Sequence, residues 1–192
     1  MKKTLLFLTA ALFSTGVLAQ STWKVDKAHS HLTFTITHLS VSDVDGTFKD
    51  FDASVIASKP DFSDAKFSFT ANASSVNTNN DQRDAHLKSP DFFNVAKYPN
   101  VTFSSTGIKP GSSAGHYVLN GNLTIAGVTK PVSLDLWYRG TITNPMSKAP
   151  DAGFQVTGTV KRSDFNFGSK FGSPMLSDEV AIKASGEFGK IN

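Results

Sequence analysis

The stretch Leu32-Thr33-Phe34-Thr35-Ile36-Thr37-His38 alternates large side chains with threonines, residue by residue. A period of two places successive side chains on opposite faces of a β-strand, so that one face meets a core and the other meets water. The same alternation recurs along the chain. We therefore expect an all-β protein with eight strands, at residues 32–38, 51–57, 67–73, 101–105, 117–125, 132–138, 154–160 and 180–188.

Turn-forming residues separate most of these strands. They occur at Asp43-Val44-Asp45-Gly46, Lys59-Pro60-Asp61, Lys109-Pro110-Gly111 and Ala126-Gly127. Short connections favour antiparallel neighbours, and eight antiparallel strands with one apolar face can close into a barrel that leaves no exposed edge. The sequence thus predicts an eight-stranded antiparallel barrel.

The interval from residue 78 to residue 99 breaks the strand pattern between strands three and four. Thr78-Asn79-Asn80-Asp81 resembles a capping box before residues 82–87, and Ser89-Pro90-Asp91 resembles a second helix start. We predict two short helical turns here. This helical insert and the Gly- and Phe-rich stretch 164–174 are both long enough to cover a barrel mouth.

The N-terminal segment predicts export. Lys2 and Lys3 precede an apolar run that closes with Val17-Leu18-Ala19, which is the pattern of a signal peptide at residues 1–19, followed by one domain at residues 20–192. The run is too short and too interrupted for the roughly 18 to 20 apolar residues of a membrane span. We expect a periplasmic protein that does not span the membrane.

Composition excludes several classes of function. The 192 residues are 39% hydrophobic and include no cysteine, so one packed domain is expected without disulfides or a thiolate metal site. Removing Lys2 and Lys3 lowers the formal net charge from +3 to +1, which offers no basic surface to nucleic acid. A P-loop and a dinucleotide fingerprint are absent. We expect a protein that is not an enzyme and holds no cofactor.

Small residues interrupt the apolar strand faces. An eight-stranded barrel lies at the border between a filled interior and one that holds a small ligand, so missing side-chain volume predicts a cavity. Alternatively, the small residues mark bends and close packing against Phe rings. The small residues are Ala53, Ala57, Ala71, Ala73, Ser105, Gly121, Gly158, Ala184 and Gly186.

The predicted cavity wall is apolar, and it selects an apolar guest because an ionised ligand would lose its hydration there. Strands of about ten residues, tilted about 40°, make a barrel roughly 25 Å tall, which exceeds the ~15 Å acyl layer of one leaflet. A fatty chain fits, whereas a long prenyl tail must fold or protrude. The predicted lipid-binding residues are Phe34, Ile36, His38, Phe51, Val55, Phe67, Phe69, Phe103, Leu123, Leu134, Leu136, Phe154, Val156, Gly158, Ile182 and Ala184.

A series of motifs across residues 23–165 resembles the YceI family of exported polyisoprenoid-binding proteins. The resemblance implies a lipocalin-like eight-stranded barrel in the periplasm, whose cavity binds an isoprenoid quinone, a polyprenyl phosphate or a fatty-acid derivative. His31 and Phe165-Asn166-Phe167 depart from the family pattern. The motifs that carry the resemblance include Trp23-x-Val25-Asp26-x-x-His29-Ser30, Gly46-x-Phe48-x-x-Phe51, Arg83-Asp84-x-His86-Leu87, Tyr98-Pro99-x-Val101-Thr102-Phe103, Gly127-Val128-Thr129-Lys130-Pro131 and Arg162-Ser163-Asp164-Phe165.

Four residues are candidates for the lipid head group: His38, Arg83, His86 and Arg162. His38 continues the apolar strand face and could bind a carbonyl or phosphate oxygen, or be held by backbone groups instead. The two arginines could bind an anionic head group, or could pair with neighbouring aspartates to tie the insert and the lid to the barrel.

Two other functional classes remain open from the sequence. An eight-stranded outer-membrane barrel has the same strand period with its apolar face outward. A stress-related interaction module with a packed interior is the other alternative. His29 and His31 share a strand face but lack an obvious third ligand, so we predict no metal site. The sequence also leaves open a homodimer of two barrels.

Overall fold

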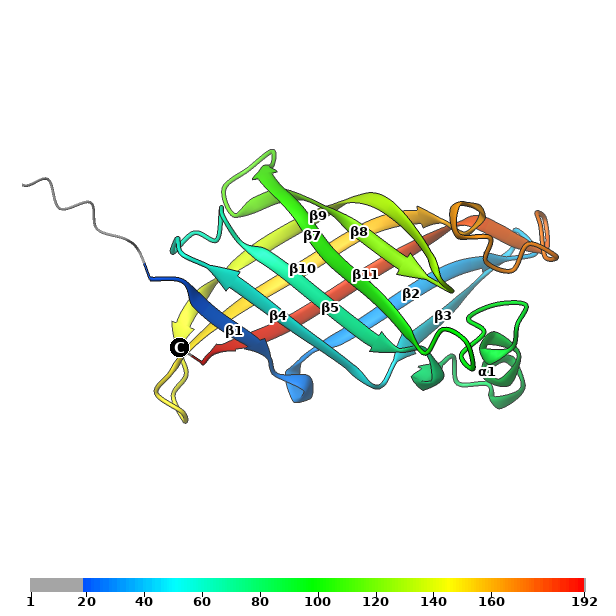
Figure 1. Ribbon diagram of the computed structural model, residues 1–192, viewed down its shortest axis with the longest axis horizontal. Helices are drawn as coiled ribbons and strands as arrows, with labels where there is room; N and C mark the ends of the chain where they lie inside the picture. The colour runs from blue at the N-terminus through cyan, green and yellow to red at the C-terminus, as the bar shows by residue number, and fades with distance from the viewer. Residues whose placement is uncertain (1–18, 192) are drawn as a thin grey trace, which may run out of the picture.

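The structure is a computed structural model that describes residues 19–191, and its strands form one antiparallel sheet that closes on itself (Figure 1). The signal-peptide prediction falls almost entirely on residues 1–18, which lie outside the described part. The strands are β1 (Ser21–Val25), β2 (His31–His38), β3 (Ser42–Phe48), β4 (Phe51–Ala57), β5 (Lys66–Asn72), β6 (Val76–Asn77), β7 (Asn100–Pro110), β8 (His116–Ile125), β9 (Val128–Thr143), β10 (Pro150–Lys161) and β11 (Leu176–Lys190).

These eleven segments form eight long strands, because three of the long strands are kinked. β1 and β2 are the two halves of one long strand, since both pair with β11. In the same way, β3 continues into β4, and β5 continues into β6. The remaining ladder runs from β5 to β7 and then through β8, β9, β10 and β11. The predicted eight-stranded antiparallel barrel is confirmed, and the kinks fall at the 3-10 turns η1 (Lys27–His29) and η2 (Ala73–Ser75) and between β3 and β4.

The turn predicted at Asp43-Val44-Asp45-Gly46 is wrong, since these residues lie within β3. The hairpin turns instead at Leu39 and Ser40, which both have positive φ. Gly46 is needed for packing, because a Cβ there would collide with the ring of Phe34 on β2. The glycine thus marks a close approach between two strands and not a turn.

The predicted helical insert is present between β6 and β7, as the helix α1 (Asp81–Lys88). Asn80 caps it, with its side-chain oxygen accepting a hydrogen bond from the Arg83 N–H at 2.9 Å. The second helical turn, predicted from Ser89-Pro90-Asp91, is absent from the described chain, which forms turns there instead. These turns bring Phe92 and Phe93 inward, where both are buried.

The apolar strand faces point into the barrel. Val55, Leu136 and Ala152 are fully shielded from solvent, whereas the threonines and lysines of the opposite faces are on the outside. This is the reverse of the arrangement that an outer-membrane barrel requires. Within residues 19–191, no helix is long and apolar enough to cross a bilayer.

One end of the barrel is plugged by the β4–β5 loop. Phe62 in this loop has positive φ and only 2% exposure, and its ring lies 5.2 Å from Trp23, 4.9 Å from Tyr138 and 4.9 Å from Phe154. The Tyr117 hydroxyl donates to the Asp61 carbonyl at 2.6 Å and holds the loop in place. This end therefore has a solid aromatic core.

Replacing Phe62 with alanine should remove the plug. We expect Phe62→Ala to lower the free energy of unfolding by about 3 to 5 kcal/mol, because the aromatic cluster loses its centre and the rigid strands limit collapse around the void. Urea unfolding followed by circular dichroism measures the change. A loss below about 1 kcal/mol would contradict the plug assignment.

Candidate functional site

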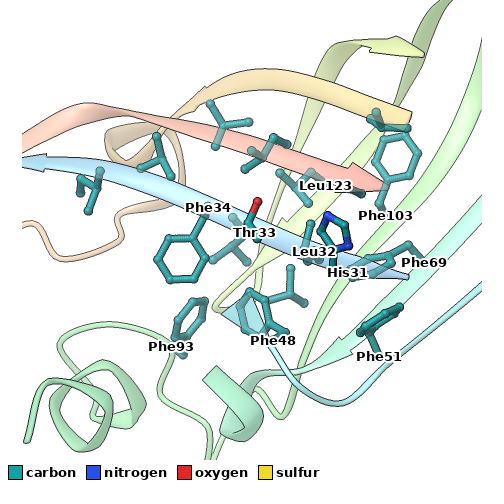
Figure 2. A pocket seen from close by; sticks show the side chains of 18 of the residues that line it. His31, Leu32, Thr33, Phe34, Phe48, Phe51, Phe69, Phe93, Phe103 and Leu123 are labelled. Atoms are coloured by element: carbon teal, nitrogen blue, oxygen red, sulfur yellow. The ribbon is translucent and has the colours of Figure 1, made fainter. Parts of the chain in front are cut away.

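Toward the other end, the barrel interior is hollow. A cavity of about 470 Å³ lies between the plug and α1, a size typical of small-molecule sites (Figure 2). Phe34, Val156 and Ile182 point inward yet are only half-buried. Inward-facing apolar side chains keep exposed surface only where neighbours do not fill the interior. The packed-interior alternative therefore applies to one end of the barrel only.

The cavity brings together most of the predicted lipid-binding residues. Three do not line it: Val55 and Leu136 are in the solid core, and Gly158 lies beneath Leu134, whose side chain an added Cβ would contact at 2.5 Å. Among the small residues, Ala53, Ala184 and Gly186 line the cavity, while Gly121 packs under the Phe103 ring. The predicted residues on the wall are Phe34, Ile36, His38, Phe51, Phe67, Phe69, Phe103, Leu123, Leu134, Phe154, Val156, Ile182 and Ala184.

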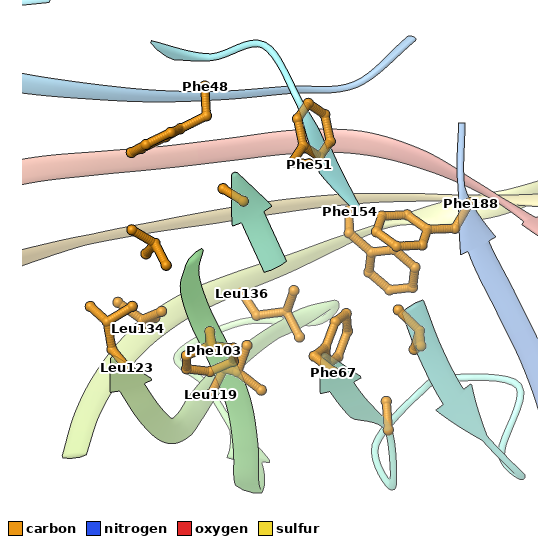
Figure 3. Close-up of a cluster of buried hydrophobic side chains, with 14 of the residues drawn as sticks. Phe48, Phe51, Phe67, Phe103, Leu119, Leu123, Leu134, Leu136, Phe154 and Phe188 are labelled. Atoms are coloured by element: carbon orange, nitrogen blue, oxygen red, sulfur yellow. The ribbon is translucent and has the colours of Figure 1, made fainter. Parts of the chain in front are cut away.

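The cavity floor is the inner face of the plugged end. Phe154 packs edge-to-face on Phe67 at 5.3 Å and on Phe188 at 5.5 Å (Figure 3). All three residues line the cavity. Along β2 the inward face runs from Leu32 to His38, about 20 Å at 3.3 Å per residue. The hollow therefore has room for an extended acyl chain and has a closed bottom.

The mouth is covered by both connections that the sequence marked as lid candidates. An aromatic cluster joins the insert to the loop after β10: Phe92 stacks on Phe171 at 5.3 Å, and Phe93 contacts Phe167 at 4.6 Å. Asp91 adds polar links, because it accepts from Lys170 Nζ at 2.6 Å and its carbonyl accepts from the Gly168 N–H at 3.1 Å. The two segments thus form one cover.

Arg162 organises this cover from below. Its side chain is 7% exposed, and its five N–H groups all donate to backbone carbonyls between 2.7 and 3.3 Å. No donor remains for a ligand, so Arg162 shapes the loop and leaves only its charge near the cavity. The sequence left open that Arg162 pairs with Asp164, but this pairing does not occur, because the guanidinium donates to backbone carbonyls instead. The accepting carbonyls belong to Phe167, Gly168, Phe171, Leu176 and Ser177.

Arg162→Lys should loosen the cover. Lysine has three donors in place of five and no planar fork, so at least two carbonyls lose their partner. We expect amide hydrogen exchange in residues 163–177 to accelerate at least tenfold, while exchange in β8 and β9 is unchanged. Unaltered exchange in the loop would contradict this role for Arg162.

Arg83 and Asp84, at the start of α1, hold Thr78. The Asp84 carboxylate, 5% exposed, accepts from the Thr78 N–H at 2.9 Å, and Arg83 Nε donates to Thr78 Oγ1 at 2.8 Å. These bonds tie the insert to β6, as one of the two interpretations of Arg83 supposed. Arg83 Nη1 makes no hydrogen bond to the described residues, and Arg83 and Thr78 both line the cavity. Arg83 therefore keeps donors for a guest.

His38 and His86 also line the cavity near the mouth. The His38 ring makes no hydrogen bond within residues 19–191, so backbone groups do not satisfy it. His86 lies 3.7 Å from the Asp91 carboxylate and packs edge-on against Phe92. The Lys170 ammonium and, to a smaller extent, His86 lower the pKa of Asp91 below 3.8. The cover thus carries an ionised carboxylate at neutral pH.

The Lys170–Asp91 link should weaken in acid. A carboxylate with a lowered pKa stabilises the folded state above its unfolded pKa, and this contribution is lost as pH falls through the lower folded pKa. Lys170→Ala should move the pKa of Asp91 up toward 3.8, as measured by NMR titration of the side-chain carboxyl carbon. An unchanged pKa would show that Lys170 is not the cause.

Outside the cavity, Asp26, His29 and Glu187 place donor atoms within 4.8 Å of one another. His29 Nδ1 lies 2.8 Å from Asp26 Oδ2, and this contact raises the pKa of His29 and lowers that of Asp26. Asp26 also caps the η1 turn by accepting from the Ala28 N–H. Because these contacts account for the kink between β1 and β2, we assign the cluster to the strand break.

Residues 111–115, Gly-Ser-Ser-Ala-Gly, have the spacing of a nucleophile elbow. They form the exposed hairpin loop between β7 and β8, closed by the Gly111 N–H donating to the His116 carbonyl. A nucleophile elbow requires a strand followed by a helix. The motif therefore carries no catalytic geometry here.

Several cavity residues were missed from the sequence. Thr78 precedes the insert, Phe92 and Phe171 belong to the cover, and Met175 is 47% exposed at the mouth. These positions lie outside regular strands, where no period of two marks a face. His31 also lines the cavity, and its departure from the family pattern was the available signal.

Together, the fold and site define a closed antiparallel barrel with an apolar internal cavity. The YceI-like domain family matches residues 23–188, and the chain belongs to this family. Protein YceI of Salmonella newport (strain SL254) is 40% identical over 190 residues, covering 97% of this chain and 98% of the relative.

Solved structures have the same fold. BcnA of Burkholderia cenocepacia aligns with a TM-score of 0.73 at 25% identity, covering 85% of this chain and 98% of BcnA. A Campylobacter jejuni YceI protein aligns with a TM-score of 0.72 at 30% identity, covering 97% and 98%. A polyisoprenoid binding domain from Saccharophagus degradans aligns at 0.63 with 16% identity, covering 90% and 99%, which shows the fold alone.

Proposed function

We propose that this protein is a periplasmic carrier that holds one long-tailed amphiphile in its barrel and does not change it chemically. The guest is an isoprenoid quinone, a polyprenyl phosphate or a fatty-acid derivative. The observation that carries the proposal is the apolar hollow between the Phe62 plug and the cover. The proposed export rests on the sequence pattern of residues 1–19.

The hydrophobic effect supplies the affinity for the tail. Each methylene moved from water to the cavity contributes about 0.8 kcal/mol, before the loss of chain freedom is subtracted. The aromatic and aliphatic wall offers few partners for polar groups along the tail. Affinity should therefore rise with tail length until the hollow is full.

The head group is best placed at the mouth. Among residues 19–191, Arg83 Nη1 has no hydrogen-bond acceptor there and the His38 imidazole has no partner. A phosphate or a quinone carbonyl supplies the acceptor oxygens that these groups lack. Arg162 adds positive charge without direct contact, because its donors are occupied.

The relatives support the same class of guest. The Saccharophagus degradans neighbour is described as a polyisoprenoid binding domain. The family match covers residues 23–188, so the part of the chain that resembles the other family members is the barrel. A prenyl tail is apolar and unbranched apart from its methyl groups, which suits a narrow hollow walled by aromatic rings.

Native mass spectrometry of protein expressed in a bacterial periplasm and purified without detergent tests the proposal. We expect an adduct of lipid mass that is released on denaturation and contains an isoprenoid or acyl tail. The apo protein should take up ubiquinone, undecaprenyl phosphate or a fatty acid. A clean apo mass and no uptake of any of the three would overturn the proposal.

A single substitution should separate the cavity from the fold. Ala184 lines the cavity from β11, so Ala184→Phe should reduce lipid uptake at least tenfold by filling the hollow. Ala181→Phe is the matched control, because Ala181 is exposed on the opposite face of the same strand. Equal uptake by both variants would contradict the site. Gly158 is unsuitable, since its substitution would clash with Leu134.

A further inference from the structure

The barrel wall has a break in its hydrogen-bond ladder, between the first and second long strands. β1 pairs with β4 as far as Lys24 and Ser54, and β2 pairs with β3 from Thr33 and Thr47. Nine residue steps on the first strand face seven on the second between these pairs. Unequal lengths cannot stay in register, so the first strand bows away at η1.

The cavity extends to this break, because residues of both rims line it. Its lining includes Ser30, His31 and Leu32 from one rim and Phe51 and Ala53 from the other. His31 lines the cavity and is also exposed to solvent. Figure 2 shows His31 and Leu32 on one side of the space and Phe51 and Phe69 on the other. We call this break in the wall the side window, bounded by residues 25–32 and 48–53.

Each rim is fastened to its outer neighbour. The Asp26 N–H donates to the Glu187 carbonyl at 2.8 Å and the Glu187 N–H to Ser30 Oγ at 3.1 Å, so one rim is fixed to β11. On the other rim, the Asp50 carbonyl accepts from the Asn72 N–H at 2.9 Å. Both rims are therefore anchored to their outer neighbours, while no ladder hydrogen bonds join them to each other in the described chain.

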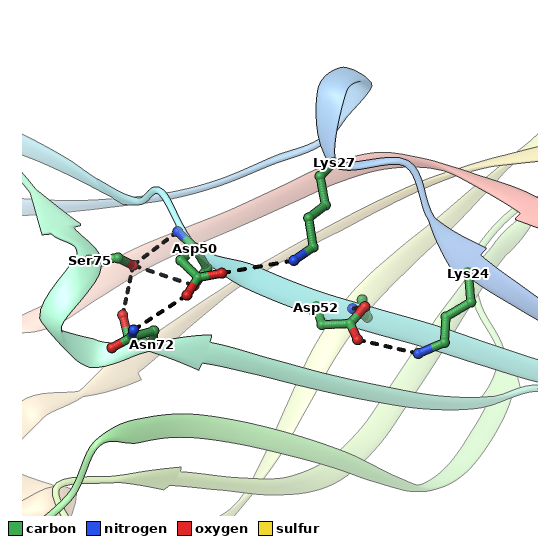
Figure 4. Close-up of polar contacts among 7 residues, drawn as sticks. Lys24, Lys27, Asp50, Asp52, Asn72 and Ser75 are labelled. Carbon is green, nitrogen blue, oxygen red and sulfur yellow. Dashed lines mark hydrogen bonds and ion pairs between the residues drawn. The ribbon is translucent and has the colours of Figure 1, made fainter.

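One ion pair spans the window from the kink. Lys27 Nζ lies 3.8 Å from Asp50 Oδ1, with both side chains more than half exposed (Figure 4). Lys24 Nζ pairs with Asp52 Oδ2 at 3.3 Å, next to the intact β1–β4 ladder. Exposed pairs of this kind are weak, so the Lys27–Asp50 pair can open easily.

The window lies at the deep end of the cavity. Val25 and Phe188, which are paired across β1 and β11, line the hollow beside the aromatic floor. A tail that enters from the mouth meets the rings of Phe154 and Phe188 and cannot continue along the barrel axis. The side window lies beside this floor, whereas the mouth is under the cover.

We propose that the side window is a tail exit, through which the part of a prenyl tail that exceeds the cavity length leaves the barrel. This inference rests on the proposed function and adds that the path of the tail depends on its length. Tails up to about the length of one leaflet stay inside, and longer ones pass between His31 and Ala53. The barrel then accepts long and short tails with the same head-group site.

A single introduced thiol reports on the window, because the chain has no cysteine. His31→Cys places it on the rim, and Ile142→Cys, at a position 66% exposed on β9, is the control. Maleimide labelling is timed for apo protein, for protein with farnesyl phosphate and for protein with undecaprenyl phosphate. Native mass spectra of the same samples measure occupancy. We expect undecaprenyl phosphate to slow labelling of the rim thiol at least tenfold, and farnesyl phosphate to leave it unchanged.

Three other results of the labelling experiment would contradict the tail exit. If both lipids bind and neither protects the rim thiol, the exit is wrong and the proposed function stands. If both protect it equally, the window holds the head group or the ordinary tail, and the exit is again wrong. If neither lipid binds, the carrier function itself fails for prenyl phosphates, and the exit fails with it.

A tether across the window gives a second measurement. Lys27→Cys with Asp50→Cys, joined by a short bis-maleimide, closes the gap, while Lys24→Cys with Asp52→Cys places the same tether beside an existing ladder. We expect only the first tether to lower uptake of undecaprenyl phosphate, at least tenfold, with uptake of farnesyl phosphate unchanged. Equal uptake of undecaprenyl phosphate by both tethered proteins would overturn the exit.

Discussion

The packing of Phe62 against Trp23, Tyr138 and Phe154 is the constraint on which the rest of the structure depends. A narrow barrel cannot be hollow along its whole length without losing the apolar burial that stabilises it. The plug concentrates that burial at one end. The other end can then leave Phe34, Val156 and Ile182 partly unpacked, which is what makes a binding cavity.

Polar contacts stabilise the cover at the mouth and the kink in the first strand. Arg162 donates all its guanidinium hydrogen bonds to carbonyls of the loop that closes the mouth, and Asp91 links that loop to the insert. The Asp26–His29 contact stabilises the turn that interrupts the first strand. Polar side chains thus shape the mouth and the strand break, whereas the apolar wall between them determines what fits inside.

The barrel was predictable because the period of two in residues 32–38 and its repeats directly records which side chains face inward. The hollow was only partly predictable. Ala184 and Gly158 look alike in sequence, yet one faces open space and the other lies under Leu134, a difference that depends on neighbours far along the chain. Gly46 is a typical turn residue in sequence, but in the structure it lies within β3 and makes room for the ring of Phe34 from β2. Local sequence does not reveal this contact between two strands. The carbonyl partners of Arg162 lie in an irregular loop, which no periodicity describes.

The central claim is that the space above the plug is occupied by a lipid tail. A crystal structure of protein purified from its own periplasm, without added lipid or detergent, tests this most directly. We expect continuous tubular electron density alongside Phe34, Val156 and Ile182, starting near Arg83. Discrete water peaks in that space, or side chains collapsed to fill it, would show that no lipid tail occupies the barrel.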